Sequence, residues 1–332
     1  MRSRTACLSS LLCLLAGLSS SCGNVDFTEG SVLGSVRILA SHTDKPYAAP
    51  GETVKVDLLT WDGRIEKPRP LTTYWIPIVC INPREDLYYA CFEQFAGATV
   101  PGSGGGSGGV TLEPGVDLTP YLPAGPSYSF TLPTDIVTSH PRVQGAVPYG
   151  MAVVFNIACA GHVELVARDS KNPQAMPFGC FDENRNRLGP DQYVIGFSRV
   201  YGYDTLRNAN PKIDNVFLEG KAIDRVQGIT VDRCTTKLRR DCPDIKIDVG
   251  VPESSWEVQE GDRHEQIWAA YYADIGQLDG ESRLLWDATK GQVSGAENKY
   301  KAANDPIEGT MFIVVHDNRG GTDWWQIPVH TR

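Results

Sequence analysis

Short runs in which apolar and polar side chains alternate are the feature that most constrains how this chain folds. In one such run Val54, Val56 and Leu58 alternate with charged residues. A period of two is that of a β-strand, whose successive side chains point to opposite faces. Many of the 33 glycines and 22 prolines lie between the runs, where they favour turns and interrupt helices. The pattern predicts an all-β protein, with a helix as the alternative only over residues 266–273.

The runs fall into two series, which predicts two β-sandwich domains of related fold. The alternation breaks at residues 208–211, so we place one domain at 31–207 and the second at 208–332. Residues 101–109, which are rich in glycine and serine, are expected to form a mobile loop inside the first domain. The expected strands span 36–41, 54–59, 72–80, 128–132, 151–160 and 193–203 in the first series and 215–218, 245–249, 267–273, 283–286, 311–315 and 324–330 in the second.

The first residues of the chain have the features of an export signal. Two arginines precede an apolar run from Leu8 to Leu18, which is too short to span a bilayer but suits a signal-peptide core. Three serines then lead to Cys22. This segment resembles a bacterial lipoprotein signal. The resemblance implies removal of residues 1–21, a diacylglyceryl group on Cys22 and a tether over residues 22–30.

The residue after that cysteine bears on the destination of the protein. It is Gly23, and the sorting rule of Gram-negative lipoproteins, which comes with the resemblance, then implies the outer membrane. No later apolar run reaches about 18 residues, so the lipid on Cys22 would be the membrane anchor. An ordinary cleaved signal with an incidental cysteine is the alternative.

Six cysteines remain beyond Cys22, and an even number in an exported protein predicts three disulfides. Pairing of sequence neighbours is one arrangement, and a bridge from Cys80 to Cys159 across a sandwich is its competitor. A metal site is not indicated, because the chain has no C-x-x-C motif and its six histidines are scattered. The neighbour pairs are Cys80–Cys91, Cys159–Cys180 and Cys234–Cys242. None of these pairs crosses residue 208, so we expect two independent domains.

Two local features carry a second resemblance. The run Ala49-Pro50-Gly51-Glu52-Thr53-Val54 is similar to the start of the second strand in bacterial immunoglobulin-like domains. Trp75 stands in the third expected strand, where such sandwiches often bury a tryptophan. With the signal, these residues resemble uncharacterised bacterial surface lipoproteins with immunoglobulin-like β-sandwich domains. The resemblance implies a spacer, an adhesin or a scaffold part, and it carries over no catalytic residues.

The last expected hairpin is the candidate binding surface. If Trp325 and alternate residues after it face the core, Trp324 faces outward and forms a contact surface with Asn318 and Arg319. The alternative is that Trp324 packs against a neighbouring side chain or the first domain. A G-x-S-x-G motif at residues 105–109 lacks the preceding strand and following helix of a nucleophile elbow, so no catalytic residue is assigned.

Net charge and motifs together set the expected function. A net charge of −9 offers no basic surface for nucleic acid. We expect an outer-membrane-anchored lipoprotein with a structural or binding role toward an envelope protein or glycan, without enzyme activity, cofactor or metal. The alternatives are an accessory subunit of an envelope secretion or motility complex, and a polysaccharide-directed hydrolase, which needs two facing carboxylates.

Overall fold

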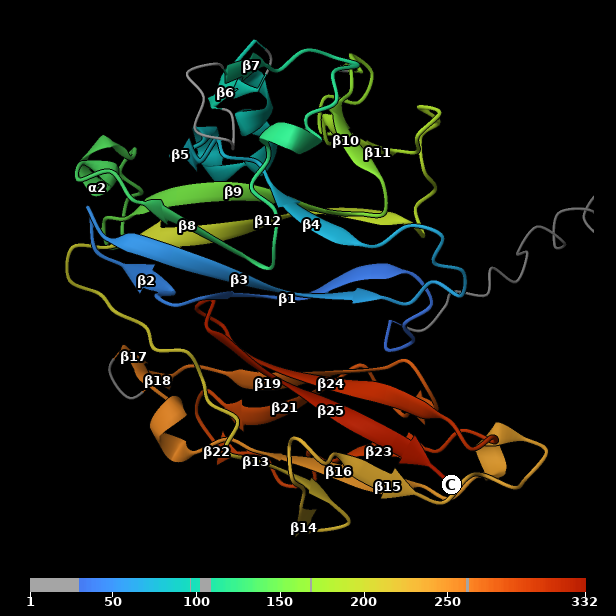
Figure 1. Cartoon of the computed structure of the whole chain (residues 1–332). Helices are drawn as coiled ribbons and strands as arrows, with labels where there is room; N and C mark the ends of the chain where they lie inside the picture. Colours follow the sequence, from blue (N-terminus) through green and yellow to red (C-terminus); the bar gives the residue numbers. More distant parts are fainter. Residues whose placement is uncertain (1–29, 96, 102–108, 168, 261–262) are drawn as a thin grey trace, which may run out of the picture.

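A computed structural model describes residues 30–332 apart from residues 96, 102–108, 168 and 261–262. The expected signal, the lipidation site Cys22 and the tether up to residue 29 lie outside the described residues, as does most of the loop 101–109. The fold is all-β, as predicted, and its one described α-helix is the single turn α2 (Ile136–Ser139). None of the described helices is long and apolar enough to span a membrane. Figure 1 shows four stacked layers of strands, two from each half of the chain.

The framework strands of the first half are β1 (Val36–Thr43), β2 (Tyr47–Ala48), β3 (Thr53–Asp62), β4 (Thr72–Trp75), β5 (Cys80–Ile81), β8 (Ser127–Thr131), β9 (Gly150–Cys159) and β12 (Tyr193–Gly202). They form two sheets, one in the order β1-β3-β8 and one in the order β2-β12-β9-β4, with β5 beside β9. Two insertions interrupt this framework. The first contains η1 (Arg84–Asp86), η2 (Tyr88–Gln94), β6 (Thr99–Pro101), β7 (Gly109–Thr111) and η3 (Thr119–Tyr121), and the second contains β10 (His162–Leu165) and β11 (Phe178–Phe181).

The strands of the second half are β13 (Asn215–Leu218), β14 (Lys221–Ala222), β15 (Ile229–Val231), β16 (Ile245–Gly250), β17 (Val258–Glu260), β18 (Arg263–His264), β19 (Ile267–Ala273), β20 (Gln277–Leu278), β21 (Ser282–Asp287), β22 (Gly291–Gln292), β23 (Asn298–Lys301), β24 (Glu308–Asp317) and β25 (Thr322–Thr331), with short helices η4 (Arg239–Asp241) and η5 (Glu253–Ser255). One sheet runs β14-β13-β16-β23-β20 and the other β15-β25-β24-β19-β21-β22, while β17 and β18 pair separately. The helical alternative for residues 266–273 is wrong. There β19 alternates fully and partly buried side chains, because one face of the strand packs on the core.

The two halves share one strand framework. The sheet β1-β3-β8 corresponds to β13-β16-β23, and β2-β12-β9-β4 corresponds to β15-β25-β24-β19. In each half a very short strand, β2 or β15, runs parallel to the last strand, β12 or β25. The other pairs in these frameworks are antiparallel. This is the arrangement of an immunoglobulin-like sandwich, and it repeats although the sequence shows no aligned repeat.

Strand β9 is buried along its whole length, as its continuous apolar run predicts for a central strand. One face packs inside the sandwich with Trp75, which is fully buried, stacks on Tyr128 and donates its indole N–H to the carbonyl of Gly125 at 3.0 Å. The other face is covered by the insertions, where the rings of Phe95 and Phe155 meet edge to face at 5.3 Å. The first half therefore has two apolar cores, one on each side of the same sheet.

Disulfides connect the insertions to this framework. The bonds join sequence neighbours, and the competing Cys80–Cys159 bridge is not formed. Two of them end on β5 and β9, so both insertions are tied to the sheet that they cover. The third closes a short loop in the second half. The three pairs are Cys80–Cys91, Cys159–Cys180 and Cys234–Cys242.

The two halves pack against each other through an apolar cluster between the second and third layers of Figure 1. Leu39 and Leu59 from the first half meet Phe312 and Val314 of β24, and the ring of Trp61 contacts Phe312 at a centroid distance of 5.0 Å. Phe312 and Val314 are fully buried. The two sandwiches are therefore not independent, because each covers apolar surface of the other.

Candidate binding site

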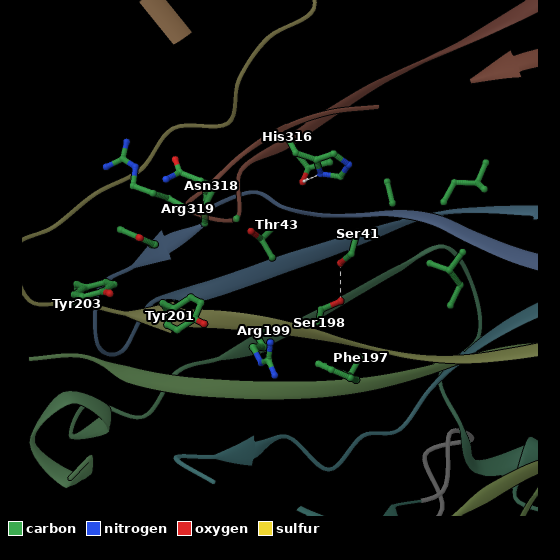
Figure 2. Close-up of a pocket in the computed structure, with 17 residues that line it drawn as sticks. Ser41, Thr43, Phe197, Ser198, Arg199, Tyr201, Tyr203, His316, Asn318 and Arg319 are labelled. Atoms are coloured by element: carbon green, nitrogen blue, oxygen red, sulfur yellow. Dashed lines mark hydrogen bonds between the residues drawn. The ribbon is translucent and has the colours of Figure 1, made fainter. Parts of the chain in front are cut away.

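A groove of about 720 Å³ lies where the two halves meet. Figure 2 shows its walls, which come from β1, from the end of β12 with the residues after it, and from the turn between β24 and β25. Concave sites between two domains are common places for ligands. Among its lining residues are Ser41, Tyr47, Ser198, Tyr201, Tyr203 and Arg319.

The segment that joins the halves fixes the groove walls. The side chain of Asn210 accepts a hydrogen bond from the Thr322 amide and donates one to the Thr43 carbonyl, both at 2.8 Å. Asn208 is buried and donates its side-chain N–H to the Asp317 carboxylate at 3.0 Å. The residues that break the alternation in the sequence thus hold the two halves at a set position, so the groove is largely formed before any ligand arrives.

Three tyrosines, Tyr47, Tyr201 and Tyr203, line one side of the groove, and the ring of Tyr149 outside the groove extends them into a continuous aromatic strip. The ring of Tyr47 lies 4.6 Å from that of Tyr203 and 6.2 Å from that of Tyr201, and Tyr149 lies 6.0 Å from both of the latter. All four rings are partly buried. Burial raises the pKa of Tyr47, Tyr149 and Tyr203, so these phenols stay neutral at physiological pH.

The outer end of the tyrosine strip rests on a turn. Both carboxylate oxygens of Asp86 are engaged: His140 contacts one at 2.8 Å, and the Tyr149 hydroxyl donates to the other. Asp86 has a φ of 58°, a backbone conformation that residues other than glycine rarely adopt. The rings of His140 and Tyr149 are 4.4 Å apart, so this cluster orients Tyr149 toward the other tyrosines.

At the opposite end, Arg319 belongs to a buried ionic network. Its guanidinium donates to Glu265 at 2.8 Å and to Glu257, and it lies 5.7 Å from the centre of the Tyr47 ring. Glu265 has no exposed surface. Burial raises the pKa of Glu265 to about 7, and the nearby Asp317 carboxylate adds to the shift. Two carboxylates therefore offset the charge of Arg319 and hold its side chain in place.

Hydroxyl, amide and apolar side chains line the rest of the groove, together with the exposed Arg199. Ser41 and Ser198 face each other from β1 and β12 with their hydroxyl oxygens 2.6 Å apart, as Figure 2 shows. The side-chain oxygen of Asn318 accepts hydrogen bonds from Gln259 and Gln266. Within the described part of the chain, its side-chain N–H₂ group has no partner and remains a free donor on the groove wall.

His316 also lines the groove but is deeply set. Its ring stacks on Trp268 at 5.4 Å, and a hydrogen bond of 3.3 Å joins it to the Thr322 hydroxyl. Burial lowers the pKa of His316 to about 4, so it is neutral at physiological pH. The inner part of the groove therefore offers neutral hydrogen-bonding groups.

The structure divides the three residues expected on the last hairpin. Asn318 and Arg319 line the groove. Trp325 packs against the core of the second half, as its position in the strand predicts. Trp324 does not reach the groove but packs in the cluster between the halves and meets His42 edge to face at 5.7 Å. Packing on the first half, the alternative for Trp324, is the arrangement found, because β1 and β3 cover the outward face of β25.

The tyrosine strip was not found from the sequence. Its members come from β2, from the segment before β9 and from the end of β12, and they are separated by up to 156 positions. Each is an isolated tyrosine near a strand end, where no local pattern indicates a site. The one available signal was Tyr201-Gly202-Tyr203, two tyrosines on one face of the strand expected over residues 193–203.

Comparisons with known proteins give only distant likenesses to solved structures. No protein-family profile and no curated protein sequence matches the chain. Similar solved structures include the tandem Ig repeats of Dlar, at 10% identity over 90% of this chain and 98% of that one, with a TM-score of 0.22. Latent PorU from Porphyromonas gingivalis gives 11% identity over 91% of this chain and 24% of that one, with a TM-score of 0.21. The Yersinia pseudotuberculosis adhesin InvE gives 10% identity over 89% of this chain and 60% of that one, with a TM-score of 0.21. At these TM-scores the likenesses carry no argument about the fold or the function of this chain.

Proposed function

We propose that this protein is a lipid-anchored binding protein of the bacterial outer membrane, and that the groove between its two halves is the ligand site. The observation that carries the proposal is that the groove is built by both halves and fixed by the linker asparagines. A site with ordered walls loses little conformational entropy when a ligand binds. Tyrosines suit such a site, since each offers a large rigid surface with few rotatable bonds.

Export and anchoring are supported by independent features. The signal-like segment ends at Cys22, and three disulfides are typical of an oxidising compartment. Two immunoglobulin-like domains on a lipid tether would hold the groove away from the membrane surface. Replacement of Cys22 by Ala tests the anchor: the protein is expected to leave the membrane fraction yet remain folded. Retention of Cys22→Ala in membranes to the same extent as the parent chain would contradict lipid anchoring.

Photo-crosslinking in intact cells tests whether the groove binds anything. A photoreactive amino acid at Arg199, an exposed residue on the groove wall, is expected to form adducts with a cell-envelope component. The matched control position is Val226, which is 85% exposed in the second half and lies outside this groove. Adducts at Arg199 that are missing at Val226 support a groove ligand. Equal labelling at both positions, or none at either, would overturn the proposed function.

A further inference from the structure

The open edge of strand β12 identifies the class of ligand, on the condition that the groove is the binding site proposed above. β12 lines the groove, and on that side of its sheet only the two-residue strand β2 pairs with it. We propose that the groove binds an extended, acidic segment of a partner protein. The segment adds as a strand to the β12 edge beside Phe197 and Arg199, and it places a carboxylate against the Arg199 guanidinium.

The main-chain groups of this edge are available for pairing. The Ile76 amide donates to the Phe155 carbonyl, so the main-chain groups of Phe155, and of Val153 two residues before it, point away from β12. These two residues lie opposite Phe197 and Arg199 in the antiparallel register. The N–H and C=O groups of Phe197 and Arg199 therefore point away from β9 to the open edge. Among the described residues these four groups have no hydrogen-bond partner, and such groups are what an added strand binds.

The chain itself already adds a strand to this edge. β2 runs parallel to the end of β12, and the Tyr203 amide donates to the Ala48 carbonyl at 2.9 Å. The pairing stops at Pro46, which lies directly before β2 and has no N–H to donate to the Arg199 carbonyl. The sequence therefore ends the short strand at this point and leaves the next part of the same edge open.

The other edge strand of the groove, β1, is a poorer template. Its ladder with β3 shifts register between Ile38 and Ala40, and such a bulge disturbs the regular spacing of the outward main-chain groups. The Thr43 carbonyl already accepts a hydrogen bond from the linker. The hydroxyls of Ser41 and Ser198 bond to each other and so connect the two edge strands. β1 therefore forms a wall of the groove, and β12 offers the edge for pairing.

Arg199 adds a preference for acidic segments. Its side chain is exposed, and within the part of the chain that the structure describes it has no carboxylate partner, its guanidinium lying 5.1 Å from the centre of the Phe197 ring. Arg319, the other arginine of the groove, is already offset by two carboxylates. Residues directly opposite each other in paired strands point to the same face. A carboxylate opposite Arg199 therefore reaches its guanidinium, and an apolar side chain two positions along lies against Phe197.

The test is calorimetric titration of the full chain, purified in detergent, with the heptapeptide acetyl-Thr-Val-Thr-Glu-Thr-Val-Thr-amide. This peptide favours an extended strand and puts its glutamate and both valines on one face. Replacement of its glutamate by glutamine should weaken binding about fivefold, and so should Arg199→Gln, while both changes together should cost no more than either alone. Arg142→Gln, at an exposed arginine outside the groove, is the matched control and should bind the peptide like the parent chain.

N-methylated versions of the peptide test the main-chain pairing separately from the charge. Alternate N–H groups of a strand point to the same neighbour, so methylation at the glutamate and both valines blocks one edge of the peptide, and methylation at the inner threonines blocks the other. One of the two methylated peptides should bind at least tenfold more weakly than the parent peptide, and the other should keep most of its affinity.

The outcomes separate this proposal from the one on which it rests. No binding of the glutamate peptide, equal binding of the glutamate and glutamine peptides by the parent chain, or equal binding of the two methylated peptides would overturn the strand-addition proposal. Groove-specific crosslinks at Arg199 to a saccharide or a lipid alone would leave the proposed binding function standing and replace the ligand class.

Discussion

Strands β9 and β24 occupy the same place in the two halves, and both are buried on both faces, but they are covered in different ways. In the first half the insertions cover the outer face of β9, with Phe95 against Phe155. In the second half the outer face of β24 is covered by β1 and β3 of the other half, through Leu39, Leu59 and Trp61 against Phe312. The first half therefore supplies its own second core, and the second half depends on its neighbour.

This difference explains where the groove lies. A sheet with an apolar outer face must be covered by other protein surface. At the border of that contact the two packed surfaces diverge and leave a groove. The groove opens at the edge of the contact between the halves, where the turn of β24–β25 meets β1 and the end of β12. A site at that place depends on both sandwiches keeping their relative position. The linker hydrogen bonds of Asn208 and Asn210 act on that position.

Matched core truncations should give the largest effect and break the comparison directly. Phe155→Ala and Phe312→Ala each remove a fully buried ring, so each should lower the free energy of unfolding by about 3–5 kcal/mol. The two variants should differ in how far the loss of hydrogen-exchange protection extends through the molecule. Hydrogen exchange should show Phe155→Ala loosening the first half alone, whereas Phe312→Ala should also reduce protection in β1 and β3.

Urea unfolding measures both energies, and Ile65→Ala, at a 99% exposed side chain, serves as the control with an effect within about 0.5 kcal/mol. If Phe312→Ala leaves exchange in β1 and β3 unchanged, the second half does not depend on the first for its cover.

Removal of disulfides should give the next largest effect. The Cys159–Cys180 bond spans 21 positions and the Cys234–Cys242 bond spans 8. Chain-entropy arguments then give losses of about 3 and about 2.5 kcal/mol for the double alanine variants. The first loss should be accompanied by exposure of the outer face of β9, detected as binding of a hydrophobic dye, and the second should not. If the Cys234→Ala/Cys242→Ala variant binds the dye and the Cys159→Ala/Cys180→Ala variant does not, the conclusion that the first half depends on its insertions is wrong.

Much of this framework could be predicted from residue patterns, for physical reasons that also explain the misses. Alternation reports which face of a strand is buried, so the all-β class followed from it, and the continuous apolar run of β9 indicated its central position. Alternation does not show which part of the protein covers the buried face. Trp324 alternates with Trp325 and so faces away from its own core, but only the packed halves show that another sandwich lies there. The tyrosine strip was missed because its members meet only after three strand ends converge.

A change of pH should give an effect comparable to the loss of one disulfide, located at Glu265 between β18 and β19. The pKa of Glu265 is raised from its ordinary value of 4.5 to about 7 by burial and by Asp317. The native state therefore holds this proton more tightly than the unfolded chain. Its contribution to stability is fully present below about pH 4.5 and is lost as the pH rises to about 7. The loss should be on the order of 3 kcal/mol.

Glu265→Gln should flatten this part of the profile, which denaturant midpoints at a series of pH values would show. The control is Glu308→Gln, because the side chain of Glu308 is 85% exposed, and it should keep the slope. A slope that survives in Glu265→Gln would assign the pH dependence to another group.

The smallest effect should come from the contact that links the two halves through polar groups. Asn210→Ala removes one hydrogen bond to each half, from Thr322 on one side and to Thr43 on the other, and should cost about 1–2 kcal/mol. Its partners are backbone groups at the groove wall, so exchange of the Thr322 amide should accelerate well beyond the change in global stability. Asn172→Ala, at an exposed position in the first half, is the matched control and should leave that amide protected. If Thr322 exchange follows global stability alone in Asn210→Ala, the apolar cluster around Phe312 sets the position of the halves without the linker, and the groove owes its shape to that cluster.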